Sequence, residues 1–181
     1  MNEKESRERS GQKIEERFEF REIRPEEAGE AAQIEKACFP PNEACTEVMM
    51  RERAAKAPEV FLVAVDRKSG KMAGFLNGLA TDEVHLRDEF FQNADLHAPE
   101  GENIMLLGLC VLPEYRRQHL ATKIVSLYGE RERARGRKKL ILTCLDSRVR
   151  MYENMGFLDH GMSDSSWGGE KWHEMSLSLL G

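Results

Sequence analysis

The sequence lacks any apolar run long enough to cross a membrane, which takes about 18 residues or more. Its beginning, MNEKESRERSGQKIEERFEF, also lacks the apolar core of a secretory signal peptide. These absences exclude a spanning helix and a signal sequence. We therefore expect a cytoplasmic protein that has no membrane partner.

Cysteine arrangements that bind metal are also missing. The 4 cysteines form no CxxC pair, and no histidine cluster accompanies them. Zinc sites use such spacings, so we expect no metal. In a reducing compartment these cysteines are predicted to be small core residues. They are Cys38, Cys45, Cys110 and Cys144.

The charge balance gives no basic excess. A formal net charge of −5 argues against electrostatic binding of nucleic acid. One basic run, RERARGRKK at residues 131–139, is interpreted as the solvated C-terminal end of a helix, because cations there complement the helix dipole. Contact with nucleic acid is the weaker alternative for this run.

The length of 181 residues suits one domain with a tail. Residues 1–17 are almost entirely polar and are predicted to be an N-terminal tail, because they offer little apolar surface to bury. Residues 18–181 are predicted to form a single domain. Its first strand is expected at about 18–24, where apolar and polar residues alternate.

Two helices are predicted after this strand. The first begins at Pro25, which two glutamates follow, and it ends at the sequence FPPN. The second has Thr46 as a plausible N-cap and runs to about Ala57, where Pro58 stops it.

A hairpin and a long loop come next. The apolar stretches VFLVAV and KMAGFLNGLA, at 60–65 and 71–80, are separated by the turn residues DRKSG. Residues 82–99 are polar and irregular, with a short helix expected near 86–91. Because long loops commonly carry function, this segment is a candidate substrate loop.

The stretch IMLLGLCVL, at 104–112, is a continuous apolar run that predicts a strand buried on both faces. A helix is expected from about Arg117, with Gly136 as its C-cap, and then the strand KLILTC at 139–144. A right-handed crossover would place these two strands side by side and parallel.

Near the C-terminus, Ser147 is predicted to cap a short helix at 148–155 that Gly156 closes, and KWHEMSLSL at 171–179 alternates like a strand. The expected element order is β-α-α-β-β-β-α-β-α-β-β. This order predicts an α/β (α+β) fold with a central mixed, mostly antiparallel sheet flanked by helices.

The stretch LPEYRRQHLATKIV, at 112–125, raises a question about charge. Arg116 and Arg117 stand at a helix N-terminus, where the backbone dipole is already positive. Cations are unfavourable there unless an anion joins them, so the stretch predicts a phosphate site on the first-turn amides. Surface arginines before a helix are the competing interpretation.

These residues resemble a known family. The stretch 116–121 resembles the coenzyme loop of the GNAT N-acetyltransferases, whose pattern is Arg/Gln-x-x-Gly-x-Gly/Ala after an apolar strand. MYENMGF, at 151–157, resembles a second signature of that family, in which a tyrosine precedes Gly-Phe. The stretches FREIRPEEAGEAAQIEKACF and APEGENIMLLGLCVLPEYRRQ are most similar to arylalkylamine (serotonin) N-acetyltransferases.

The resemblance implies a GNAT fold over residues 18–181, with acetyl-CoA as co-substrate and direct attack by an amine in a ternary complex. It implies strand contacts to the acetyl group and pantetheine arm from Leu109, Cys110 and Val111. It implies a coenzyme loop of Arg116, Arg117, Gln118, His119, Leu120, Ala121 and Thr122. The pyrophosphate is expected on the backbone amides of that loop.

The chain departs from the family pattern at two places. His119 stands where the family most often has glycine, which allows close approach of phosphate to the backbone. Met105 and Leu107 match the positions where serotonin-type enzymes carry two histidines, and neither side chain takes a proton. The general base is therefore left open among loop residues. These are Asp82, Glu83, His85, His97 and Glu102.

Tyr152 is the candidate catalytic acid, because a phenol is protonated at neutral pH and can donate to the departing thiolate. A core tyrosine is the competing interpretation. The expected acceptor is a small-molecule amine such as an arylalkylamine, and the protein is expected to be a monomer or homodimer. Alternatives are a non-catalytic acyl-CoA-binding or regulatory module and a protein or peptide acetyltransferase.

Overall fold

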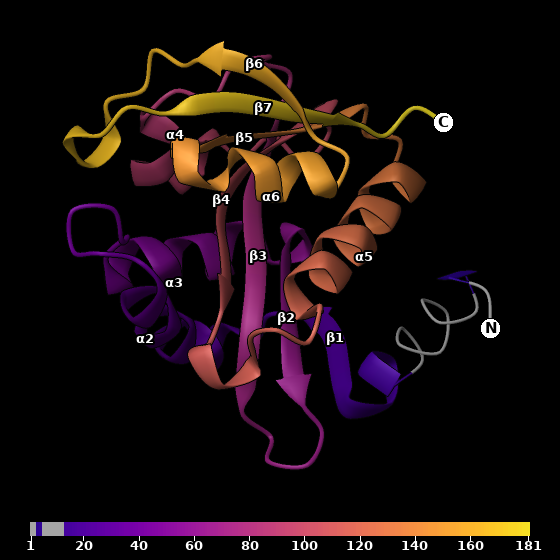
Figure 1. The fold of residues 1–181 in the computed structure, drawn as a ribbon. Coiled ribbons are helices and arrows are strands. Elements are labelled where there is room, and N and C mark those ends of the chain that lie inside the picture. The colour runs from indigo at the N-terminus through magenta and orange to yellow at the C-terminus, as the bar shows by residue number, and fades with distance from the viewer. Residues whose placement is uncertain (1–2, 5–12) are drawn as a thin grey trace.

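A computed structural model of the chain describes residues 3–4 and 13–181. In this part of the chain, the strands form one seven-stranded sheet in the order β1-β2-β3-β4-β5-β7-β6 (Figure 1). The strands are β1 (Phe18–Glu22), β2 (Phe61–Asp66), β3 (Met72–Thr81), β4 (Asn103–Val111), β5 (Lys139–Cys144), β6 (Leu158–Met162) and β7 (His173–Ser178). The helices are α2 (Ala28–Cys38), α3 (Glu47–Lys56), α4 (Glu89–Gln92), α5 (Leu120–Ala134) and α6 (Val149–Asn154).

The sheet is mixed. Strands β1 to β4 form an antiparallel meander, and β5, β7 and β6 are also antiparallel. The two halves meet where β4 and β5 pair in parallel, and α5 connects these two strands. The predicted fold class and the predicted parallel pair are therefore confirmed.

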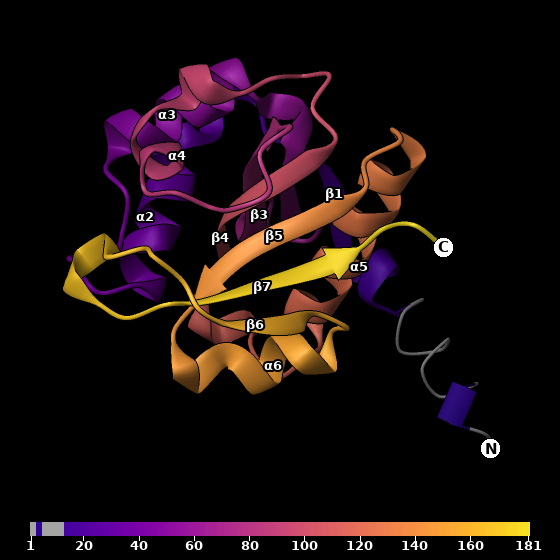
Figure 2. The ribbon, with the colours of Figure 1, turned by 90° about the horizontal axis from the view of Figure 1, so that it is seen from above.

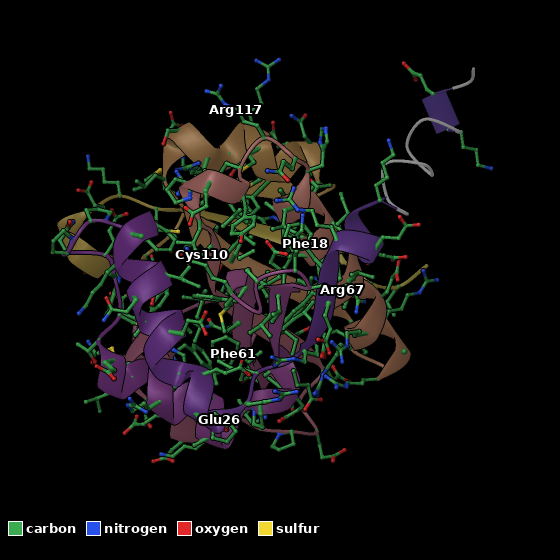
Figure 3. All side chains as sticks on the ribbon, turned by 90° about the horizontal axis from the view of Figure 1, so that it is seen from below. Phe18, Glu26, Phe61, Arg67, Cys110 and Arg117 are labelled. Atoms are coloured by element: carbon green, nitrogen blue, oxygen red, sulfur yellow. The ribbon has the colours of Figure 1, made fainter. Side chains whose placement is uncertain are left out.

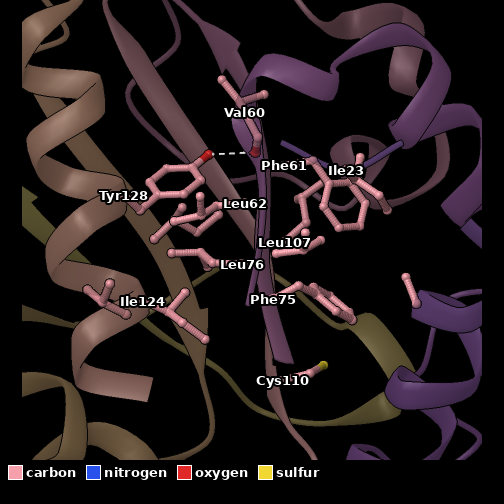
Figure 4. Close-up of a cluster of buried hydrophobic side chains, with 14 of the residues drawn as sticks. Ile23, Val60, Phe61, Leu62, Phe75, Leu76, Leu107, Cys110, Ile124 and Tyr128 are labelled. Carbon is pink, nitrogen blue, oxygen red and sulfur yellow. Dashed lines mark hydrogen bonds between the residues drawn. The ribbon is translucent and has the colours of Figure 1, made fainter. Parts of the chain in front are cut away.

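Helices cover both faces of the sheet. Helices α2 and α3 lie on one face, and α5 and α6 lie on the other (Figure 2). Figure 4 shows the resulting two-sided core, in which Tyr128 and Ile124 of α5 face Leu62 and Leu76. The Tyr128 hydroxyl donates to the Val60 carbonyl over 2.9 Å, so its polar atom is satisfied inside the core. Apolar residues on both sides explain why β2, β3 and β4 are nearly continuous apolar runs.

The predicted helix ends are partly confirmed. Thr46 caps α3, because its Oγ1 accepts from the Met49 amide over 3.2 Å. Gly136 and Gly156 follow α5 and α6 with φ values of 85° and 99°, the left-handed conformation that ends a helix. The predicted cap at Ser147 is wrong, because a 3₁₀ turn precedes α6 and Arg148 occupies the N-cap position without a side-chain bond.

The basic run at 131–139 is not wholly solvated. Arg137 and Glu132 are buried, and their side chains pair over 3.1 Å. Arg137 also donates through Nη1 to the Pro99 carbonyl over 2.7 Å. The prediction of a solvated helix end is therefore wrong for this pair, which ties the end of α5 to the segment before β4.

The predicted boundary between tail and domain stays a prediction. Residues 1–2 and 5–12 of the predicted tail lie outside the described residues. Residues 13–17 are helical, and Ile14 is buried against the core. Among the described helices, none is long and apolar enough to cross a membrane.

Candidate active site

The two halves of the sheet separate at the centre of the molecule. Strands β4 and β5 pair only from Asn103–Lys139 to Met105–Ile141, although each strand continues further. A bulge in β4 lies just beyond this junction, because Asn77 pairs with Gly108 whereas Gly78 pairs with Leu106. Leu107 is the extra residue, and such a bulge bends its strand. The parting of β4 and β5 leaves backbone groups of both strands available to a ligand.

The loop that follows β4 leads to an uncapped helix N-terminus. His119 is the N-cap of α5 and makes no side-chain capping bond, so first-turn amides of α5 remain available. Arg117 and His119 have φ values of 60° and 62°, a conformation that non-glycine residues seldom adopt. Amides in such left-handed turns commonly form anion-binding concavities. Left-handed backbone at His119 also explains why glycine suits this position.

The side chains of the predicted coenzyme loop take different directions. Arg117 is exposed and lies at the periphery of the molecule (Figure 3). Arg116 instead turns back, donating through Nε to the Val111 carbonyl over 2.9 Å. Gln118 accepts a hydrogen bond from Arg17 of the N-terminal segment. Arg116 and Gln118 thus stabilise the loop itself, whereas Arg117 is open to a ligand.

The other predicted coenzyme-binding residues differ in exposure. Leu109 is half-buried, whereas Cys110 and Val111 are buried at the end of β4. In the first turn of α5, Leu120 is buried, Ala121 is half-buried and Thr122 is exposed. If the buried members contact a coenzyme as predicted, only their backbone atoms are available for it.

Tyr152 projects from α6. Its ring packs edge-on against Phe157 with centroids 5.5 Å apart, and its hydroxyl makes no hydrogen bond within the described part of the chain. Burial raises the pKa of Tyr152, and the neighbouring thiols of Cys144 and Cys110 raise it further. These thiols belong to β5 and β4, so the phenol lies near both separating strands. It stays protonated at neutral pH, as a proton donor must.

A buried polar cluster on the α2 face was not found by sequence reasoning. Glu35 of α2, Arg53 of α3 and Asn77 of β3 are 3%, 2% and 0% exposed. Glu35 contacts the Cys45 thiol, and Arg53 donates to the Phe91 carbonyl over 2.8 Å. Within the described residues, Arg53 Nη1 and Asn77 Oδ1 are buried without hydrogen-bond partners. Buried groups of this kind are costly unless something else satisfies them.

A second missed group is the Cys38 thiol at the end of α2. It lies 3.5 Å from the Val111 carbonyl and 3.7 Å from Arg116 Nη2. The Cys110 thiol donates to Cys38, and together with Arg116 it lowers the pKa of Cys38 to about 6. Burial raises the pKa of Cys110. The prediction of small core residues is confirmed for Cys45, Cys110 and Cys144, which are buried, whereas Cys38 is half-buried at the edge of the core.

The candidate bases of the 82–99 loop are largely engaged in structural contacts. His97 accepts from the Ala80 amide over 3.0 Å and contacts Glu59. Asp82 accepts from the Glu102 amide over 3.0 Å, and Glu83 pairs with Arg87 over 2.7 Å. Such contacts hold the loop in place. Glu102, which precedes β4, pairs with Lys138 over 2.8 Å, and the exposed His85 bonds Glu174 over 2.9 Å.

A surface groove of about 800 Å³ lies between this loop and the β6–β7 hairpin. It extends to Ile141, the last residue of β5 that pairs with β4. Its acidic groups outnumber its lysine and arginine side chains. The acidic residues are Asp88, Glu89, Asp164 and Glu174, and the basic ones are Arg87 and Lys139. This composition suits a cationic ligand.

Segment 163–172 begins at the groove, which residues 163–165 line, and then contacts the loop between α2 and α3. Trp167 stacks on Phe91 with centroids 4.9 Å apart, and its Nε1 donates to the Glu43 carbonyl over 2.9 Å. Asn42 Nδ2 donates to the Gly168 carbonyl over 3.0 Å. These contacts hold the segment against the α2–α3 loop and the loop before β4.

Comparisons with known proteins bear on the family and the fold of the chain. Residues 28–157 match the model of the acetyltransferase (GNAT) family. Among curated proteins, none matches the chain in sequence.

Solved structures share the fold at low sequence identity. The loading GNATL domain of CurA from Lyngbya majuscula superposes with a TM-score of 0.77 at 14% identity, over 90% of this chain and 98% of that one. The ribosomal-protein-S18-alanine N-acetyltransferase from Escherichia coli gives 0.63 at 20% identity, over 90% and 94%. A phosphinothricin acetyltransferase from Sinorhizobium meliloti, solved with AcCoA, gives 0.64 at 15%, over 90% and 88%.

The Cys38 environment predicts selective alkylation. At pH 7 a thiol of pKa about 6 is mostly thiolate, whereas burial raises the pKa of Cys45, Cys110 and Cys144. Iodoacetamide should modify Cys38 first, with a rate that rises through about pH 6, as peptide mass mapping would show. Replacing Arg116 with Gln should move that midpoint upward. Equal labelling of all four thiols would contradict the assignment.

Proposed function

The chain belongs to the acetyltransferase (GNAT) family, and we propose that it transfers the acetyl group of acetyl-CoA to a primary amine. The observation that carries this proposal is the gap between β4 and β5, because a group that could bind an anion and a group that could donate a proton both lie beside it. One is the uncapped N-terminus of α5, and the other is the protonated phenol of Tyr152.

The coenzyme would bind along this gap. Its pyrophosphate would lie on the amides from Arg117 to Thr122, where the helix dipole and the left-handed turns favour an anion. Arg117 would add charge from the surface. The pantetheine arm would follow the backbone of Leu109–Val111 toward the bulge, so that the thioester lies beside Leu107 and Gly108.

The reaction would be a direct attack in a ternary complex. The amine nitrogen forms a bond to the acetyl carbon, and the carbon–sulfur bond of the thioester breaks. A backbone amide near the bulge would stabilise the oxyanion that develops on the carbonyl. Tyr152 would donate its proton to the departing thiolate, which needs a protonated phenol beside the sulfur.

The acceptor would be a small primary amine, with arylalkylamines as the first class to examine. The acidic groove that reaches Ile141 supports a cationic acceptor, since an alkylamine is mostly protonated at pH 7. The stacked rings of Phe91 and Trp167 each follow a groove residue, Glu89 and Ser165, by two positions and offer aromatic surface.

A thiol-release assay tests the proposed activity. Acetyl-CoA is mixed with the protein and a panel of arylalkylamines, polyamines and short peptides, and free CoA is followed by a thiol reagent. We expect turnover with at least one small amine and acetylated product by mass spectrometry. Turnover confined to peptides would redirect the acceptor assignment, and coenzyme binding without turnover of any panel member would favour a binding module.

The loop geometry predicts unequal roles for its two arginines. Arg117→Ala should weaken acetyl-CoA binding about 3- to 10-fold in calorimetry, a loss that shrinks at high salt because a surface charge is screened. Arg116→Ala should instead lower the melting temperature, because it removes the hydrogen bond to the Val111 carbonyl that holds the loop. Equal affinities for wild type and Arg117→Ala at low salt would exclude the Arg117 side chain from the site.

Tyr152→Phe should lower kcat by about 10²- to 10⁴-fold while acetyl-CoA affinity is retained, because only the transferable proton is removed. The matched control is Tyr128→Phe, which removes the buried bond to the Val60 carbonyl and leaves the Tyr152 phenol in place. That control should lose about 1 kcal/mol of stability and keep kcat. An unchanged kcat in Tyr152→Phe, measured where chemistry limits the rate, would remove Tyr152 as the acid.

A further inference from the structure

The proposed reaction needs a proton acceptor for the amine, and β4 supplies none. Met105 and Leu107 are buried apolar residues at the junction and the bulge. Figure 4 shows Leu107 on the same side of the sheet as Phe75, the face that α2 covers. A base that deprotonates an amine approaching the thioester from this face must therefore come from α2, α3 or β3.

Glu35 of α2 faces β4 at this point. A Cβ atom placed on Gly108 would lie 3.2 Å from Glu35 Oε1 and 3.6 Å from Asn77 Oδ1. Two oxygen acceptors therefore converge above Gly108, the residue that follows the bulge. Asn77 is fully buried, and its Oδ1 has no hydrogen-bond partner in the described part of the chain.

Two acceptors at one point suit a group with several N–H donors. A primary ammonium has three, so one can be given to a carboxylate and another to an amide oxygen. The absence of a side chain at Gly108 leaves β4 open there, since any Cβ would crowd Glu35. The pattern matches the amine of the acceptor better than it matches the carbonyl of the thioester, which needs donors.

We propose that Glu35 is the general base that takes the proton of the acceptor ammonium, and that Asn77 Oδ1 orients the amine over Gly108. This proposal rests on the proposed acetyl transfer. One proton moves from the ammonium to the Glu35 carboxylate and then to solvent, and the neutral nitrogen attacks the acetyl carbon. The second proton, lost from nitrogen as the adduct collapses, replaces the one that Tyr152 gives to sulfur.

The charges around Glu35 determine its pH behaviour. Burial raises the pKa of Glu35, whereas Arg53 and Cys45 on the α3 side lower it in part. Cys110 faces it from β4 and has its own pKa raised by burial, so it stays neutral. A raised pKa makes the carboxylate a stronger base. Activity should therefore rise with pH around a midpoint that lies above the pKa of an ordinary glutamate, and it should be lost as the pH falls below that midpoint.

The test compares two acceptors of different basicity. Glu35→Gln keeps the size of the side chain and removes the base, so kcat with an ordinary alkylamine should fall about 10²- to 10³-fold at pH 7. The best acceptor from the panel is paired with its β,β-difluoro analogue, in which the electron-withdrawing fluorines lower the ammonium pKa toward neutrality, so that a far larger fraction is neutral at pH 7. The variant should lose less activity on the fluorinated amine, because that neutral fraction needs no base to start the reaction.

Three further readouts separate this role from a structural one. The acetyl-CoA affinity and the melting temperature of Glu35→Gln should stay close to wild type, and the acidic limb of the pH–rate profile should disappear. Glu35→Asp, which keeps a shortened carboxylate, should recover part of the rate. Glu30→Gln is the matched control, since it changes a second glutamate of α2, which accepts from the Met72 amide over 2.9 Å and does not line the groove.

Equal losses on the two amines, or an unchanged pH profile in Glu35→Gln, would overturn the assignment. So would wild-type kcat in the folded variant. These outcomes differ from failure of the proposed function, in which wild type itself binds acetyl-CoA and releases no thiol with any amine.

Discussion

The short parallel contact between β4 and β5 is the constraint on which the structure depends. Three residue pairs, from Asn103–Lys139 to Met105–Ile141, join an antiparallel meander to an antiparallel three-stranded unit. The buried Arg137–Glu132 pair lies beside this junction and holds the end of α5 against the segment before β4. Because the closed end is fixed so firmly, the strands can part at the other end without loss of the core.

The bulge at Leu107 determines which groups of β4 face the gap between β4 and β5. It turns β4 away from β5 and presents Gly108 to the α2 face. Backbone groups thus become available to a thioester on one side, while Glu35 and Asn77 approach from the other. The same strand ends in the loop that we propose binds the pyrophosphate, so a single continuous segment would position the coenzyme from its acetyl group to its pyrophosphate.

Most elements could be predicted because their signals are local. Alternation in 18–24, the Thr46 cap and the apolar run of β4 each reflect the physics of one element. Glu35 could not be found this way, since a glutamate in an amphipathic helix normally faces water and its burial depends on α3 and β3. The bulge could not be predicted from the sequence either, because every residue around Leu107 is apolar or glycine and no change of pattern marks it. The turn of Arg116 toward the Val111 carbonyl likewise depends on packing that sequence periodicity does not report.

The helical segment at 13–17 has a consequence for how this domain can vary. Arg17 bonds Gln118 and lies over the rings of Phe18 and Tyr115, and Glu15 pairs with Lys123 of α5 over 2.9 Å. The chain just ahead of β1 therefore braces the turn that precedes α5. Substitutions in this segment would therefore change the proposed pyrophosphate-binding turn indirectly, without altering any residue that the proposal places against the coenzyme.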